Sequence, residues 1–248
     1  MWKEGLSVKR KRISILLIVL LLLVSCAKQP TNQTADLWSL GNHYPVTYSK
    51  MCHVYHYSIG PDVFYLSVTR GKKDTRESSE AKDTLTVGDR TIALYGEASE
   101  TEGAPAYTYY QCIADGYRYL ICNSETKLDL AGKLSIKDAA SILKDPLHPS
   151  GGAAFDYEEW TAYYRTDTCN LELYIYPNDQ GARAKAPDSS YESRTTDGET
   201  YLYSEIDHGI VYTNGVHSVW IRQFNREGEE PILYSTVAEC MAILAMLG

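Results

Sequence analysis

Four runs of residues typical of β-strands occur along the chain. They form one pair in each half, and the two pairs resemble each other. They are rich in Val, Ile, Leu, Tyr and Phe, which fit a pleated and half-buried surface, and they occupy residues 63–68, 91–95, 171–176 and 201–203. A glycine turn comes shortly before the second run of each pair, at Gly88 and at Gly198. The pattern predicts several antiparallel strands in each half of the chain.

Two dipeptides typical of β-hairpin turns lie 99 residues apart. Asp115-Gly116 and Asn214-Gly215 each separate two strand-like runs, and both dipeptides favour the type I′ turn. With a two-residue turn at 115–116, Cys112 and Cys122 point to opposite faces of the hairpin because side chains alternate along a strand. We therefore expect no disulfide between these two cysteines.

An amphipathic helix is predicted after each hairpin. Ser135 with Asp138, and Thr236 with Glu239, have the spacing of an N-terminal capping box, which the longer Glu side chain fits better than Asp. Behind each cap, apolar residues recur at the helical spacing i, i+3, i+4, i+7. These residues are Ile136, Ala139, Ala140 and Leu143 in the first helix and Val237, Cys240, Met241 and Leu244 in the second.

Hairpin, cap and apolar stripe recur in the same order, which indicates a tandem duplication with a period near 100 residues. The elements predict an α+β fold of two tandem related modules, each an antiparallel sheet followed by one C-terminal amphipathic helix. We expect copy 1 at residues 37–147 and copy 2 at 148–248, with a breaker-rich joint at 147–153. Whether the modules are separate domains or share one sheet stays open at this point.

A basic segment and a short apolar run open the chain. Five Lys or Arg residues precede residue 13, and residues 13–24 are apolar except for Ser14. This run is shorter than the roughly 20 residues of a membrane-spanning helix and fits the roughly 7–15 of a secretory leader. It ends in Leu23-Val24-Ser25-Cys26, which resembles the lipobox of bacterial lipoproteins.

The lipobox resemblance implies a lipid anchor. In that class the signal peptide, here residues 1–25, is cleaved between Ser25 and Cys26, and the Cys26 thiol carries a diacylglyceryl group with acyl chains such as palmitate. Two acyl chains hold a protein firmly at a membrane. Residues 26–36 are polar and would form a tether. The implied location is the extracytoplasmic face of the cell membrane, with the membrane as a partner through the anchor.

The charge of the chain argues against nucleic acid as a partner. The net charge is −8, and removal of residues 1–25 deletes five basic residues and one Glu, which makes it about −12. A nucleic-acid-binding surface requires positive charge. The one basic cluster, at 70–73, lies close to Glu77 and Glu80 and is interpreted as a solvated loop.

Three common motifs of hydrolases and nucleotide-binding proteins were sought in the sequence. Gly-x-Ser-x-Gly, HExxH and the Walker phosphate loop are all missing. Cys52 and His56 are weak candidates for metal ligands, since both would lie on one face of a strand while His53 points away. Such a site would need further ligands, for example His43, so no metal and no cofactor are expected.

Tyrosine is abundant, at 21 of 248 residues. Exposed aromatic side chains can stack on sugar rings or grip a peptide, although tyrosine also suits half-buried strands. The candidate ligand-binding residues are Trp38, Tyr109, Tyr117 and Trp160.

The order of elements in residues 198–247, and more loosely in 88–147, resembles uncharacterised extracellular modules of bacterial lipoproteins and membrane-anchored regulators. In those modules a strand pair around an Asn-Gly or Asp-Gly turn precedes a short amphipathic helix, and no catalytic residues carry over. We expect a membrane-anchored extracytoplasmic lipoprotein with a non-enzymatic binding, sensing or scaffold role and an unknown protein, peptide or glycan partner. One alternative is cell-wall glycan or peptide binding through exposed Tyr and Trp. The other is a hydrolase with a cryptic site.

Overall fold

The computed structural model describes residues 37–71, 80–97, 107–123, 129–186, 190–225 and 232–247. The predicted signal peptide, the cleavage site at Ser25 and Cys26, and the tether at 26–36 lie outside the described residues, as does part of the basic cluster at 70–73.

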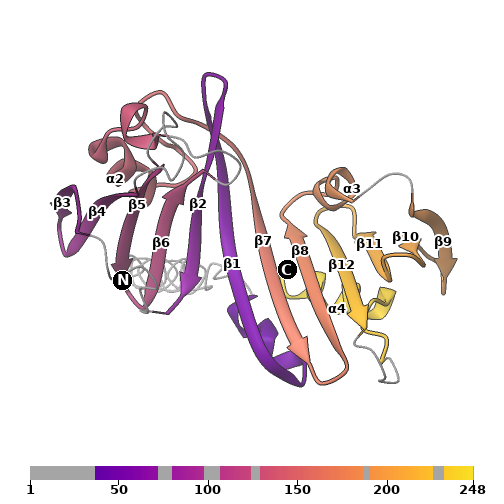
Figure 1. Cartoon of the computed structure of the whole chain (residues 1–248). Coiled ribbons are helices and arrows are strands. Elements are labelled where there is room, and N and C mark those ends of the chain that lie inside the picture. Colours follow the sequence, from indigo (N-terminus) through magenta and orange to yellow (C-terminus); the bar gives the residue numbers. More distant parts are fainter. Residues whose placement is uncertain are drawn as a thin grey trace, which may run out of the picture.

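The described residues form one continuous antiparallel sheet of twelve strands, in the order β3-β4-β5-β6-β2-β1-β7-β8-β12-β11-β10-β9 (Figure 1). The strands are β1 (Val46–Ile59), β2 (Asp62–Arg70), β3 (Asp83–Val87), β4 (Arg90–Glu97), β5 (Tyr107–Ala114), β6 (Tyr117–Cys122), β7 (Ala154–Thr166), β8 (Cys169–Tyr176), β9 (Glu192–Thr196), β10 (Glu199–Ser204), β11 (Gly209–Thr213) and β12 (Ser218–Asn225).

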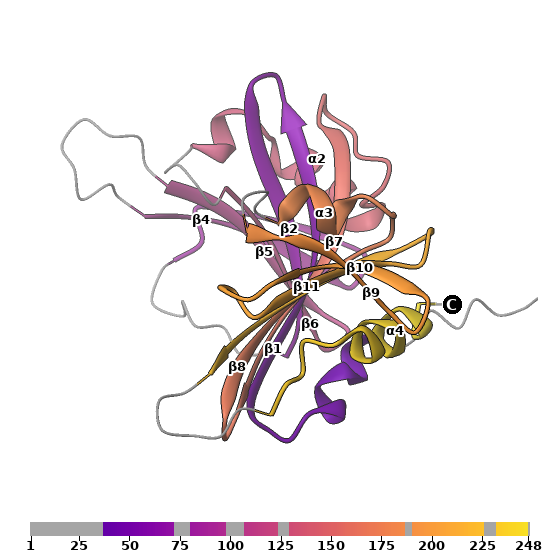
Figure 2. The same cartoon turned by 90° about the vertical axis from the view of Figure 1, so that its right-hand side faces the viewer.

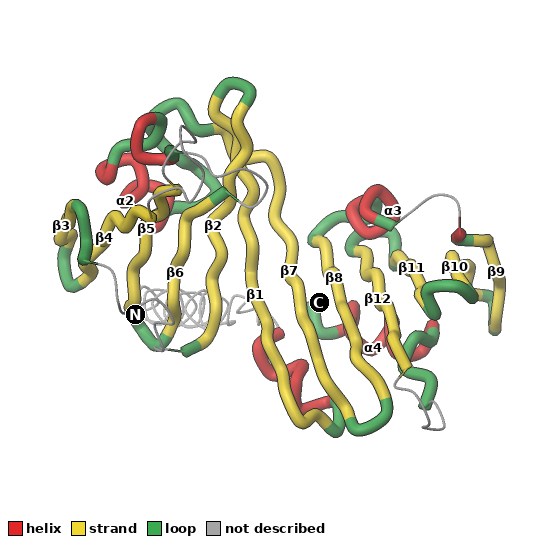
Figure 3. The backbone as a smooth tube through the Cα atoms, viewed as in Figure 1, coloured by secondary structure: helices red, strands yellow, loops and turns green. Residues whose placement is uncertain are grey.

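The predicted fold class is wrong. The structure is mainly sheet with few short helices, and the residues assigned to two modules share that sheet because β1 and β7 pair from Val46–Thr166 to Ser58–Ala154. Figure 3 shows these two long strands side by side at the centre of the sheet. Counted outward from them, the order is β1-β2-β6-β5-β4-β3 on one side and β7-β8-β12-β11-β10-β9 on the other. The two halves thus share a strand order without forming separate modules.

Short helices cover both faces of the sheet. They are η1 (Leu37–His43), η2 (Leu130–Gly132), α2 (Ile136–Lys144), α3 (Gly181–Lys185) and α4 (Val237–Ala245). We call the side covered by η1, α2 and α4 the helix face, and α3 packs on the opposite face. Figure 2 shows η1 and α4 on the same side of the sheet.

Three apolar clusters hold the helices on the sheet. α2 lies against β3 and β4, and its cluster includes side chains of β1, β2, β4, β5 and β6. η1 with α4 packs on β7, β8, β11 and β12. A smaller cluster lies under α3 around Trp220. In β8, Leu171 and Leu173 are fully buried, and burial of a Leu side chain contributes roughly 1.5–3 kcal/mol.

The two hairpin turns differ from each other. The turn at 115–116 is the predicted two-residue turn, with φ of 55° and 80°, and Cys112 pairs with Tyr119 as expected. The second is a four-residue loop, because Thr213 pairs with Ser218. There the Asn214 side-chain oxygen accepts hydrogen bonds from the backbone N–H groups of the third and fourth loop residues. The type I′ prediction is wrong at this second turn.

The caps also depart from expectation. Ser135 and Asp138 complete a capping box at α2. At α4, Thr236 accepts from the Glu239 backbone N–H, but the Glu239 carboxylate lies 3.6 Å from His43 Nε2 in η1. The prediction that the Glu239 box is the better one is therefore wrong, since a tertiary contact takes the side chain away. On the apolar stripe of α4, Met241 is 43% exposed.

Candidate functional site

Three of the four aromatic residues proposed for ligand binding meet in the structure. The Trp38 ring in η1 lies 5.4 Å from that of Tyr117 at the start of β6 and 5.0 Å from that of Trp160 in β7, between ring centroids. All three are partly exposed. They come together on the helix face because β2 and β1 place β6 and β7 on either side of η1. The geometry therefore supplies a half-exposed aromatic surface.

Tyr109, the fourth candidate, lies elsewhere. It is 1% exposed in β5, and its ring stacks on Tyr95 in β4 at a centroid distance of 5.3 Å. Its side chain points to the opposite face of the sheet, since Tyr110 belongs to the cluster under α2. Tyr109 is thus separated from the other three.

A histidine ion pair extends the aromatic surface along β1. The His53 ring stacks on Trp160 at 4.1 Å with an interplanar angle of 14°, and its Nε2 lies 2.8 Å from Glu158 Oε2. In the His53 tautomer whose Nε2–H donates to Glu158, Nδ1 is an acceptor. The Tyr55 hydroxyl lies 3.1 Å from this Nδ1 and can donate to it. Burial raises the pKa of Tyr55, so its hydroxyl keeps its proton. These contacts fix the His53 ring against Trp160.

We call Trp38, His53, Tyr55, Tyr117 and Trp160 the aromatic cluster. The alternation of side chains along β1 indicated that His53 points away from Cys52 and His56. The sequence carried no signal that it would stack on Trp160, whose strand is more than 100 residues away.

A pocket of about 520 Å³ adjoins the aromatic cluster and shares Trp38 as a wall. It forms where β2 ends at Arg70, because among the described residues β1 has no neighbouring strand on this side beyond that point. Side chains from both faces of the sheet therefore reach it. Its cations are Lys50, Arg70 and Arg118.

The pocket changes the interpretation of the basic cluster at 70–73. Arg70 lines the pocket, and its guanidinium lies 5.8 Å from the centroid of the Trp38 ring, within the usual range of a cation–π contact. Sequence reasoning missed Lys50 and Arg118, which stand alone among β-forming residues. Strand alternation places Lys50 on the same face as Cys52, and this is the one local signal that could have singled it out.

The weak metal candidates have other partners. Cys52 Sγ lies 2.8 Å from Ser67 Oγ, and burial raises the pKa of the thiol, which disfavours the metal-binding thiolate. His56 Nε2 lies 3.1 Å from Glu159 Oε1, and His43 lies beside Glu239 instead. Within the described ranges, no three His, Cys, Asp or Glu side chains gather in a way that could hold a metal ion.

The His56–Glu159 pair is the more buried of the two pairs that join β1 to β7. Glu159 is 4% exposed. Burial acts to raise its pKa, but the hydrogen bond from His56, the neighbouring Tyr176 hydroxyl and the charge of Lys185 together outweigh burial, so that the net pKa is lowered. The His56 ring also stacks on Tyr157 at 4.1 Å.

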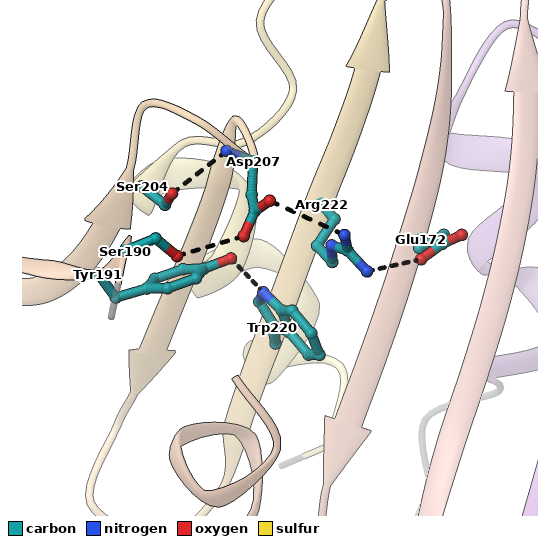
Figure 4. A network of polar contacts seen from close by, with 7 residues as sticks. All are labelled: Glu172, Ser190, Tyr191, Ser204, Asp207, Trp220 and Arg222. Atoms are coloured by element: carbon teal, nitrogen blue, oxygen red, sulfur yellow. Dashed lines mark hydrogen bonds and ion pairs between the residues drawn. The ribbon is translucent and has the colours of Figure 1, made fainter. Parts of the chain in front are cut away.

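In the second half of the sheet, Arg222 of β12 lies in a network of carboxylates (Figure 4). Its guanidinium lies 3.5 Å from Glu172 and 3.9 Å from Asp207. Asp207 in turn accepts from the Ser190 hydroxyl at 3.4 Å. This cation is therefore neutralised within the chain.

Cysteine-histidine catalysis finds no geometric support in the described part of the chain. Cys169 is fully buried and lies beside the Thr166 hydroxyl, and Cys52 is paired with Ser67. No histidine is hydrogen-bonded to either thiol among these residues.

No protein-family model matches the chain, and a search of curated proteins finds no sequence with significant similarity to it. Among the helices that the structure describes, none combines the length and the apolar character that crossing a membrane requires.

Proposed function

We propose that this protein is a membrane-anchored extracytoplasmic lipoprotein with a non-enzymatic binding role, and that the aromatic cluster and its adjoining pocket bind the ligand. The observation that carries the binding role is the meeting of Trp38, Tyr117 and Trp160 beside a pocket. The lipobox at residues 23–26 supports the anchor.

The geometry suits recognition of a ring. Aromatic faces stack on sugars and on aromatic peptide side chains, and they lose little conformational entropy when they do so. A volume of about 520 Å³ lies in the range of roughly 300–1,000 Å³ typical of small-ligand sites. His53 and Trp160 project from the central strands of the sheet, which makes their positions rigid. The ligand class is a glycan or a peptide.

Binding is tested with the full-length protein in a nonionic detergent, by calorimetric titration against saccharides and peptides from cell walls. We expect Trp38→Ala to weaken binding by about tenfold, since an aromatic contact contributes roughly 0.5–1.5 kcal/mol. Phe224→Ala is the control, because Phe224 is an exposed aromatic residue in β12. Equal losses in both variants, or no binding by the parent protein, would contradict the proposal.

The anchor is tested separately in bacterial cells fed labelled palmitate. The parent chain should incorporate label and yield a mature protein that begins at acylated Cys26. Cys26→Ala should incorporate none and should retain residues 1–25, as seen by mass. Label that persists in Cys26→Ala would refute lipidation at this cysteine.

A further inference from the structure

We propose that the pocket beside Trp38 recognises a negatively charged group, a phosphate or a carboxylate, on a sugar ring. This inference rests on the proposed binding function and names the chemistry of its ligand. It follows from the charges that line the pocket, from the hydrogen-bond donors that Lys50 and Arg118 keep for a ligand, and from the ring that the pocket shares with the aromatic cluster.

Three cations converge on the pocket from three strands. Lys50 of β1 and Arg118 of β6 reach it from the opposite face, and Arg70 reaches it from the end of β2. No Asp or Glu is among the described residues that line it, although the chain has 32 acidic residues against 24 basic ones. Like charges that converge in a concave site repel one another and attract an anion. The lining is therefore positively charged, although the whole chain carries a net negative charge.

Lys50 and Arg118 keep hydrogen-bonding capacity for a ligand. Arg118 Nε donates to the Gln111 side-chain oxygen at 2.9 Å, which leaves the other N–H donors of the guanidinium without an acceptor in the described residues. Lys50 has no carboxylate within ion-pair distance in that same part of the chain. The hydroxyl groups of Ser67 and Thr69 also line the pocket. Guanidinium, ammonium and hydroxyl donors are the groups that bind phosphate and carboxylate oxygens.

Arg222 provides a comparison within the same molecule. It projects from the same face of the sheet as Lys50 and Arg118, as the paired strands between them show. Two carboxylates of the chain, Glu172 and Asp207, lie beside it (Figure 4). Among the described residues, neither Lys50 nor Arg118 has such a carboxylate as a partner, so an external anion can take that place.

Trp38 provides a surface on which the ring of an acidic sugar can stack. Its indole lies under Arg70 on one side of the pocket and touches Tyr117 and Trp160. A ligand that places its charge between Lys50 and Arg118 can therefore lay a ring against Trp38. An acidic sugar combines both features, whereas inorganic phosphate offers only the charge.

The test compares charged and neutral forms of one sugar. The full-length protein in nonionic detergent is titrated by calorimetry with glucose 6-phosphate, glucuronate, glucose and inorganic phosphate. We expect one or both acidic sugars to bind at least about tenfold more tightly than glucose, since a charge-assisted hydrogen bond contributes roughly 1.5–3 kcal/mol. Which of the two binds more tightly distinguishes phosphate from carboxylate, and inorganic phosphate should bind more weakly than either sugar that binds.

Variants assign the effect to the pocket. Lys50→Gln and Arg118→Gln should each weaken binding of the acidic sugar by about tenfold. Lys137→Gln removes the same charge from an exposed position on α2 and should leave binding unchanged. Equal binding of acidic and neutral sugars that still depends on Trp38 overturns the anion proposal and leaves the binding function standing. Binding of none of the sugars overturns the anion proposal, and the wider ligand panel then decides on the binding function. An equal loss in Lys137→Gln overturns the pocket assignment.

Discussion

The His56–Glu159 pair between the two central strands allows a quantitative test of the structure. The hydrogen bond joins His56 Nε2 to a carboxylate that is 4% exposed, and Glu159 Oε2 has no hydrogen-bond partner in the described residues. His56→Ala would leave a buried carboxylate without its main donor. Breaking a buried pair from one side costs about 3–5 kcal/mol. We expect the lower end, about 3 kcal/mol, because His56 itself is partly exposed.

Thermal and denaturant unfolding of the full-length protein in detergent measure this cost. For a chain of this size, about 3 kcal/mol corresponds to a fall in Tm of roughly 6–12 °C. Removal of the His56 ring also removes its stacking on Tyr157, which contributes about 0.5–1.5 kcal/mol. The double variant His56→Ala/Glu159→Gln separates the two effects. It should recover all of the loss except the stacking part, because a neutral amide costs less to bury than a carboxylate.

An exposed pair of the same kind serves as the control. The side chains of His148 and Asp145 are 80% and 55% exposed, and surface pairs contribute only about 0–1 kcal/mol. His148→Ala should therefore shift Tm by no more than about 4 °C. The reasoning fails if His56→Ala costs no more than His148→Ala. It also fails if the added Glu159→Gln substitution restores nothing.

Three further predictions concern pH, the core and the first turn. Because the pKa of Glu159 is lowered in the folded state, its ionised carboxylate stabilises the fold at pH values above the ordinary Glu pKa of 4.5. This stabilisation is lost as the pH falls through the folded-state pKa. The Tm advantage of the parent chain over Glu159→Gln should therefore shrink on acidification. Leu173→Ala should cost about 2–5 kcal/mol in denaturant unfolding, and Leu147→Ala, at a residue 46% exposed, should cost about 0.5 kcal/mol or less. Gly116→Ala, at φ 80°, should lower the free energy of unfolding by about 1 kcal/mol; an unchanged value would refute the turn geometry.

Local chemistry in the sequence was enough to predict some elements. The Asp115-Gly116 turn formed as expected because positive φ at two adjacent residues depends on those residues alone. Both helix starts were also visible in their caps. The Asn214 turn was not predictable in the same way, since the Asn side chain takes part in a longer loop.

The central pairing and the candidate site depend on contacts distant in sequence. β1 and β7 bring His53 next to Glu158, 105 residues away, and no local pattern distinguishes a strand with two neighbours from one with a free edge. Trp38, Tyr117 and Trp160 were chosen by residue type, and only the sheet order showed that they meet. The pocket cations escaped notice because each stands on a different strand.

The outermost strands of the described sheet, β3 and β9, have a consequence for many copies held side by side. Both strands are five residues long, mostly exposed, and rich in Thr with charged residues at Asp83, Glu192 and Arg194. Long apolar edges would let neighbouring chains add strand to strand and polymerise. Copies held in a membrane by the proposed anchor would meet that hazard at high local concentration, because they would be confined to two dimensions. Short polar edges at both ends keep each sheet from growing into its neighbours.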